Sequence, residues 1–383
     1  MPVFVYVLGL AVFAQGTSEF MLSGLVPGIA ADLSVPVGAA ASLTSAYAIG
    51  MIIGAPVMAA LSARWPRRRA LAGFLAAFVV VHVLGAVTTD FAVLFGTRIV
   101  AAIVNAGFLA VAMSVATALV RPTEHGRATA VLLSGITLSC VAGVPAGALL
   151  GDWAGWRSAF WAVAALCLPA LAFVFRSAPA DAADRRDVSV REEAGALRSR
   201  RLQRALVLAV LVNGATFATF AYLAVIATDV AGLPAGAVPV LLAAFGVGAF
   251  TGVTVAGRLG DVRLWPALCA LPVGWAALAV TGAHPAALHA LAVVQGALSF
   301  GVGSALVGRV MRIASDAPSL SGAFATVALN VGAFLGPLSA AVATRTAADY
   351  RAAPWVSAVL AAGAIVVIGV RRRGSSRPPR VPR

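Results

Sequence analysis

Apolar stretches of about twenty residues recur along the whole chain, and breaks rich in arginine, proline or glycine separate them. A helix of about twenty apolar residues crosses the roughly 30 Å hydrocarbon core of a bilayer. Twelve such stretches are expected, at residues 4–31, 40–62, 70–88, 91–119, 127–150, 157–176, 204–229, 236–258, 264–282, 286–309, 319–344 and 351–370. The pattern predicts an all-α membrane protein with twelve transmembrane helices.

The overall composition agrees with a membrane location. Of the 383 residues, 61% are hydrophobic and 11% are charged, whereas a typical soluble domain is about 25% charged. A chain with so few charges cannot cover itself with a polar surface and needs lipid around it. The first apolar stretch is expected to be a retained helix and not a cleaved signal peptide, because no basic segment precedes it and Glu19 interrupts it.

All 28 basic residues are arginines, and the net charge is +14. They lie in short clusters between the apolar stretches, which is typical of membrane topology and not of a nucleic-acid-binding surface. With both termini in the cytoplasm, 24 of the 28 arginines are cytoplasmic, and only Arg157, Arg345 and Arg351 lie outside, with Arg98 inside a helix. Because basic residues favour the cytoplasmic side, the pattern predicts a multi-pass protein of the cytoplasmic (inner) membrane with both termini inside.

One long hydrophilic segment divides the twelve stretches six and six. The expected organisation is an N-terminal six-helix bundle at 1–176, a cytoplasmic central loop at 177–203, a C-terminal six-helix bundle at 204–370 and a basic cytoplasmic tail at 371–383. A shift of 198 residues superposes Gly16 on Gly214, Gly50 on Gly248, Gly54 on Gly252 and Leu61 on Leu259. Repeated six-helix halves around a central site are one architecture of secondary transporters.

Two full charges fall inside the expected hydrocarbon region, Glu19 in the first helix and Arg98 in the fourth. Such charges are costly in lipid unless they face the interior of the bundle, and they usually serve function. Burial disfavours the ionised form of a carboxyl, so Glu19 is the candidate to bind and release a driving proton. A fixed ion pair between Glu19 and Arg98 is the structural alternative, and the sequence leaves it open.

Six polar or aromatic residues are candidates to line a pocket for a small amphipathic molecule at mid-membrane depth, because such pockets are apolar with a few hydrogen-bonding groups. They are Tyr47, Asn105, Asn213, Phe217, Phe220 and Asn330. Each would serve equally well in contacts between helices or as bulk facing lipid. The three cysteines and four histidines lack metal-ligand spacing, and the chain has no HExxH motif, no GxSxG nucleophile setting and no P-loop. No metal, no cofactor and no enzymatic activity are therefore expected.

A glycine-rich motif follows the eighth apolar stretch, with Gly257 at its start and Asp261 at its end. Glycine at a helix end allows close helix approach, while Asp261 can cap a helix or pair with arginine. This motif and the equivalent segment 59–68 resemble the signature of the major facilitator superfamily. In segment 59–68, Ala63 stands where that signature usually has an acidic residue, and Pro66 where it has glycine.

That N-terminal segment holds Arg64 and Arg68, which either take part in a conformational latch or anchor helix ends at anionic lipid headgroups. With six plus six helices and this motif, the chain resembles the major facilitator superfamily over essentially its whole length. Arg98 is similar to the helix-four arginine of that superfamily's proton-transfer motif, although Ala102 replaces the usual glycine.

The fifth helix carries small residues at four-residue steps, with a proline among them: Gly135, Ser139, Gly143, Gly147 and Gly151, with Pro145. Small residues at this spacing form a smooth face for close packing, and the proline bends the helix. The stretch resembles the antiporter motif of exporters in the superfamily. Generic tight packing of helices explains the same spacing, and the alternative stays open.

Segments 9–27, 143–151 and 155–157 resemble the actinobacterial chloramphenicol-resistance exporters, which belong to the drug:proton antiporters with twelve helices. The resemblance implies that the chain exchanges cytoplasmic chloramphenicol for external protons by alternating access and so confers antibiotic resistance. It also implies that the chain works as a monomer. A sugar or other metabolite exporter of the same superfamily is the alternative function.

Overall fold

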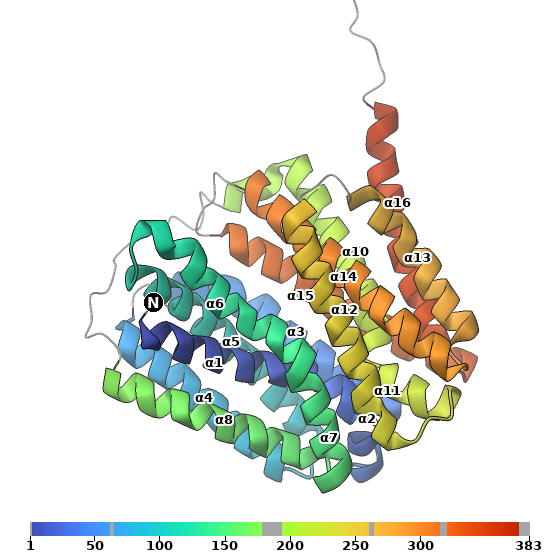
Figure 1. Cartoon of the computed structure of the whole chain (residues 1–383), viewed down its shortest axis with the longest axis horizontal. Helices are drawn as coiled ribbons and strands as arrows, with labels where there is room; N and C mark the ends of the chain where they lie inside the picture. The colour runs from blue at the N-terminus through green and yellow to red at the C-terminus, as the bar shows by residue number, and fades with distance from the viewer. Residues whose placement is uncertain (1, 62–64, 178–193, 260–263, 315–319, 375–383) are drawn as a thin grey trace, which may run out of the picture.

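The structure is a computed structural model that describes residues 2–61, 65–177, 194–259, 264–314 and 320–374. Helices follow one another where the twelve apolar stretches were predicted (Figure 1). The N-terminal half contains α1 (Val3–Phe20), α2 (Leu22–Asp32), α3 (Val37–Leu61), α4 (Arg67–Val87), α5 (Phe91–Ala118), α6 (His125–Leu138), α7 (Val144–Ala154) and α8 (Trp156–Ser177). The C-terminal half contains α10 (Arg200–Phe220), α11 (Leu223–Val225), α12 (Val238–Leu259), α13 (Leu264–Thr281), α14 (Pro285–Ile313), α15 (Ser321–Ala347) and α16 (Ala352–Gly374).

The described helices confirm the predicted all-α membrane fold. Ten spans are long and apolar enough to cross a bilayer, and the shorter apolar segments Trp265–Thr281 in α13 and Ala352–Ile368 in α16 complete twelve crossings. The helix ends differ from the predicted ones by a few residues. For example, α10 begins at Arg200, inside the expected central loop, because its first turn is polar and extends the helix beyond the apolar stretch.

Three predicted spans are interrupted helices, which the hydropathy pattern does not reveal. The first breaks at Met21, between α1 and α2, and the seventh breaks between α10 and α11, so the first helix of each half is interrupted at a similar place. In the fifth, a π-helical turn at Ser139–Gly143 separates α6 from α7. Pro145 lies just after this turn and has no N–H for a normal helical bond, which accounts for the local change of hydrogen bonding.

Each half packs mainly on itself. In the N-terminal half, α1 packs against α6 and α8, and α4 packs against α5 and α8. In the C-terminal half, α12 packs against α14, and α16 packs against α10 and α13. The halves meet where α3 contacts α15 and where α12 contacts α7 and the π-helical turn.

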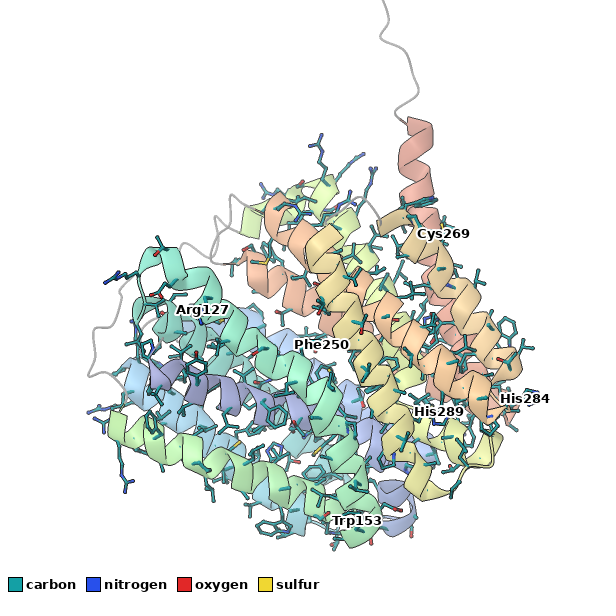
Figure 2. The ribbon with its side chains drawn as sticks, viewed as in Figure 1. Arg127, Trp153, Phe250, Cys269, His284 and His289 are labelled. Carbon is teal, nitrogen blue, oxygen red and sulfur yellow. The ribbon has the colours of Figure 1, made fainter. Side chains whose placement is uncertain are left out.

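Contacts between the halves gather toward the end of the molecule that holds α2, α7 and α11 (Figure 1). There α2 packs against α11, and the Ser45 hydroxyl of α3 donates to the Phe334 carbonyl of α15 at 2.9 Å. Figure 2 shows Trp153 at this end and Arg127, at the start of α6, toward the other. Trp153 is 74% exposed, as expected of an aromatic side chain at a membrane–water interface.

Candidate functional site

Arg98 lies buried in the N-terminal half, where α5 passes α1. Its guanidinium donates to the Ser18 hydroxyl at 2.8 Å and to the Ser18 carbonyl oxygen at 2.6 Å. Its central carbon lies 4.7 Å from the ring centroid of Tyr47 and 5.7 Å from that of Phe160. A cation over an aromatic face is stabilised by the quadrupole of the ring. The fold therefore holds the positive charge in the membrane with hydrogen bonds and two aromatic rings.

His82 of α4 completes this arrangement. Its Nε2 lies 2.6 Å from the Ser18 hydroxyl oxygen, and its Nδ1 lies 2.7 Å from the Phe78 carbonyl oxygen. A carbonyl only accepts, so Nδ1 carries the proton, and Nε2 of the neutral ring accepts from the Ser18 hydroxyl. The hydroxyl oxygen in turn accepts from Arg98. A one-directional chain of donors thus runs from Arg98 through Ser18 and His82 to the backbone of α4.

The role of His82 gives a prediction for stability. His82→Leu leaves the buried Ser18 hydroxyl without its acceptor, which should lower the free energy of unfolding by about 1–3 kcal/mol. His82→Gln keeps an acceptor and should cost clearly less. Reversible denaturant unfolding in mixed micelles measures both variants. A wild-type unfolding midpoint for His82→Leu would show that the histidine does not support Ser18.

Glu19 follows Ser18 and has a different environment. Its side chain is only partly buried, and within the described residues no ion pair or hydrogen bond joins it to Arg98. The two charges still interact electrostatically, and Glu19 also lies near Tyr47 and Cys140. The Arg98 guanidinium donates its hydrogen bonds to Ser18. The Glu19 carboxylate therefore lies near a fixed positive charge without forming an ion pair with it.

Four of the predicted pocket residues make hydrogen bonds inside the bundles. Asn105 donates to the Tyr47 hydroxyl at 2.8 Å, next to Arg98. Asn213 of α10 donates to the Leu329 carbonyl of α15 at 2.6 Å, and Asn330 donates to the Thr326 carbonyl of its own helix at 2.9 Å. These amides and the Tyr47 phenol therefore join or stabilise helices in this conformation.

The other two predicted pocket residues, Phe217 and Phe220, belong to an aromatic cluster that joins the two halves. Phe20 lies 6.1 Å from Phe217 and 6.4 Å from Phe300 between ring centroids. Phe245 lies 4.8 Å from Phe220 and 6.1 Å from Phe300. Only Phe20 comes from the N-terminal half, and it directly follows Glu19. Phe20 therefore brings the first span of the N-terminal half into contact with aromatic surface of the C-terminal half.

Sequence reasoning did not select Phe20, Phe245, Phe300 or His82. In sequence, phenylalanines on apolar helices look like ordinary core residues. Only Phe20 could have been singled out as a site residue, because it directly follows Glu19. His82 carried a weak one, because a titratable side chain stands within a predicted membrane span.

The small residues of the fifth span face the first span of the same half. A Cβ atom on Gly135 would lie 2.6 Å from the Gly9 carbonyl oxygen, one on Gly147 would lie 3.1 Å from Met21 Cβ, and one on Gly143 would overlap Thr17. Gly151 similarly packs against Leu25 of α2. The smooth face, in which Pro145 is partly buried, thus brings α6 and α7 close to α1 and α2.

The remaining motif residues lie at the other end of the helices. Arg68 donates to the Phe175 carbonyl and so ties α4 to α8. Gly257 is part of α12. Arg64 and Asp261, and with them the predicted charge latch, lie outside the described residues.

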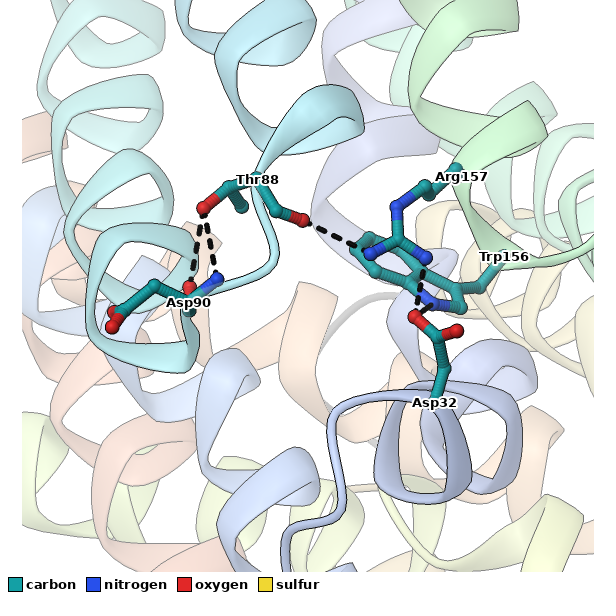
Figure 3. A network of polar contacts seen from close by, with 5 residues as sticks. All are labelled: Asp32, Thr88, Asp90, Trp156 and Arg157. Atoms are coloured by element: carbon teal, nitrogen blue, oxygen red, sulfur yellow. Dashed lines mark hydrogen bonds and ion pairs between the residues drawn. The ribbon is translucent and has the colours of Figure 1, made fainter.

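A polar network fixes α2 to the rest of its half (Figure 3). Asp32, at the end of α2, accepts hydrogen bonds from Arg157 and from the Trp156 indole N–H at 3.1 Å. Arg157 also donates to the Thr88 carbonyl at 3.0 Å, and its guanidinium carbon lies 4.4 Å from the Trp156 ring centroid. The Arg157 and Trp156 hydrogen bonds hold the pKa of Asp32 below its usual value.

This network predicts a pH dependence. Because the folded-state pKa of Asp32 is depressed, its contribution is present above the unfolded value of about 3.9 and is lost as the pH falls through the folded value. The pair is partly exposed, so Asp32→Asn should cost about 1 kcal/mol or less at neutral pH. Unfolding curves of wild type and variant should converge as the pH falls through the depressed folded-state pKa of Asp32. A constant difference down to low pH would contradict this role.

Within the described part of the chain, no group of three or more histidine, cysteine or acidic side chains is placed to hold a metal ion. Comparison with known proteins then decides the family, because the family model for the Major Facilitator Superfamily matches residues 8–328. The chain belongs to the Major Facilitator Superfamily. Members of this superfamily are transporters, so the chain is a multi-pass membrane protein and a secondary transporter, not an enzyme.

Several relatives in the superfamily match nearly the whole chain. A chloramphenicol resistance protein of Streptomyces lividans is 52% identical over 374 residues, which cover 96% of this chain and 95% of the relative. The inner membrane transport protein YdhP of Escherichia coli K12 is 32% identical, with 96% and 95% covered. A chloramphenicol efflux pump of Mycobacterium tuberculosis is 31% identical, with 87% and 83% covered.

A solved structure shows the same fold. The crystal structure of the human organic anion transporter MFSD10 aligns with 96% of this chain and 100% of its own length, with a TM-score of 0.68 and 16% sequence identity. The full-length match confirms the predicted major facilitator fold.

Proposed function

We propose that this transporter exports chloramphenicol across the cytoplasmic membrane in exchange for protons and thereby confers antibiotic resistance. The observation that carries the proposal is the 52% identity, over almost the entire length, to a chloramphenicol resistance protein. A second relative, with 31% identity, is a chloramphenicol efflux pump. The substrate is neutral and aromatic, and such molecules bind in apolar sites with few polar groups.

The geometry around Glu19 supports exchange at one place. Among the described residues the Glu19 carboxylate makes no ion pair with Arg98, whose guanidinium donates to Ser18, so the carboxylate is free to take up and release a proton. The residue after Glu19, Phe20, belongs to the cluster with Phe217 and Phe220, and aromatic faces of this kind suit a nitrophenyl ring. Drug and proton would therefore compete for the surroundings of Glu19, which is the condition for antiport.

Alternating access follows from the two-part architecture. We take residues 1–176 and 204–370 as the two bundles, 177–203 as a cytoplasmic loop and 371–383 as a cytoplasmic tail. With the termini in the cytoplasm, the contacts between α2 and α11 close the external side, and this conformation accepts drug from inside. The chain is proposed to act as a monomer, as membership of the superfamily implies.

Uptake of labelled chloramphenicol by an efflux-deficient host tests the function. Cells that express the chain should retain less drug than control cells, and a proton uncoupler should remove the difference. Equal retention with and without the chain would reject chloramphenicol as substrate and favour the sugar or metabolite exporter. Lower drug retention that is unchanged by the uncoupler would reject proton coupling.

A further inference from the structure

A groove of about 370 Å³ lies on the N-terminal half between α4 and α5. Its walls include Trp65, Arg69, Gly73, Phe74 and Ala77. The Trp65 ring stacks on Phe74, with 5.5 Å between centroids and 29° between planes. The groove is therefore apolar along its length and carries an arginine near the start of α4.

The position of the groove on α4 shows what surrounds it. Arg69, Gly73 and Ala77 follow one another at four-residue steps, which places them along one face of the helix. Farther along α4, Val80 and Leu84 are 64% and 46% exposed. The helix packs against α5 and α8 of its own half. In a membrane, this exposed apolar face lies against lipid.

The charges at the groove favour a negative ligand. Arg68 is committed to the Phe175 carbonyl, whereas Arg69 is exposed and lines the groove. The first turn of α4 holds no acidic residue that could pair with a cationic headgroup. Trp65 is 42% exposed, and tryptophan favours the depth of lipid headgroups.

We propose that this groove is a binding site for an anionic phospholipid such as phosphatidylglycerol. The phosphate pairs with Arg69, Trp65 lies at headgroup depth, and one acyl chain occupies the groove over Gly73 and Ala77. A free anion would pair with Arg69 but would make no contact with the apolar walls of the groove. A zwitterionic lipid would fill the walls, but its cationic group meets no carboxylate in the first turn of α4.

Tryptophan quenching by brominated lipids tests the site in reconstituted vesicles. The signal of Trp65 is obtained as the difference between the wild-type chain and Trp65→Phe. Brominated phosphatidylglycerol should quench this signal at a roughly fivefold lower mole fraction than brominated phosphatidylcholine, which corresponds to one arginine near an anionic headgroup. Equal quenching by the two lipids would overturn the proposal.

Two variants separate the charge from the shape of the groove, each combined with Trp65→Phe for the difference signal. Arg69→Gln should remove the preference for phosphatidylglycerol and leave quenching by phosphatidylcholine unchanged. Gly73→Leu should weaken quenching by both lipids, and it should fold because a Cβ atom at Gly73 has no neighbour within 4 Å. Arg345→Gln is the matched control, since Arg345 is an exposed arginine in the last turn of α15, and it should change nothing.

Further outcomes would also overturn the proposal. Preference for phosphatidylglycerol that survives in Arg69→Gln would show that the headgroup does not bind there. Unchanged quenching in Gly73→Leu would show that no acyl chain occupies the groove. Loss of quenching on addition of inorganic phosphate would identify a free anion as the ligand.

Discussion

Replacement of Glu19 by glutamine is expected to remove almost all uncoupler-sensitive chloramphenicol export while the protein still folds and binds the drug. Glutamine has nearly the same shape as glutamic acid but cannot release a proton, so the coupling step is lost. The neighbouring Arg98 keeps its bonds to Ser18, which explains why folding should survive. Drug retention in cells and equilibrium drug binding to purified protein measure the two effects separately.

The matched control is Glu124→Gln. Glu124 lies in the short 3₁₀ helix Pro122–Glu124, outside the membrane spans, and should not affect export. Residual export by Glu19→Gln should no longer respond to external pH. Full export driven by a pH gradient in that variant would remove Glu19 from the mechanism.

Replacement of Gly246 by valine should also abolish most transport, but through conformation. Gly246 of α12 crosses the π-helical turn of the other half, and a Cβ atom there would overlap the Cys140 carbonyl oxygen and lie 2.9 Å from Val141 Cα. Overpacking of this kind costs about 1–3 kcal/mol, which shifts a conformational equilibrium roughly 5- to 150-fold. The external contacts between the halves should open, and export should fall accordingly.

Gly248 provides the comparison for Gly246. It lies two residues later on the same helix, but its Cβ would overlap the Val293 carbonyl of α14, within its own half. Gly248→Val should therefore lower the yield of folded protein instead of opening the external side. A cysteine placed at Gly28, which lines the cavity between the halves, reports on opening through its labelling rate. Wild-type labelling and export in Gly246→Val would contradict the proposed closure.

The fold was largely predictable, because the hydropathy of each segment and the arginine clusters beside it determine whether, and in which direction, that segment crosses the membrane. Each crossing needs its own run of apolar residues, so the spans could be read without knowing their neighbours. The break at Met21 and the π-helical turn before Pro145 were not predicted. An interruption changes backbone hydrogen bonds without changing the apolar character of the segment, so hydropathy does not register it.

The site was predictable only in part. Glu19 and Arg98 stood out because charges in lipid are costly, but their relation depended on how α1, α4 and α5 pack. The binding role of Asn105, Asn213 and Asn330 stays a prediction, and the structure adds the hydrogen bonds that they make inside the bundles. The rotation of an almost uniformly apolar helix has no signature in its sequence, so side-chain direction came from tertiary packing.

The sequence by itself determined that this chain crosses a membrane twelve times, which residues carry charge into it, and the family to which it belongs. These properties depend on the free-energy cost of moving polar groups into lipid. That cost is set by the composition of each segment and does not depend on how the other segments pack. Only the tertiary structure decided that Arg98 donates to Ser18, which in turn bonds to His82, and that Arg98 does not pair with Glu19. Packing alone also decided that Phe20 joins the aromatic cluster of the opposite half. Such contacts join residues far apart in the chain, and their geometry exists only once the helices have packed.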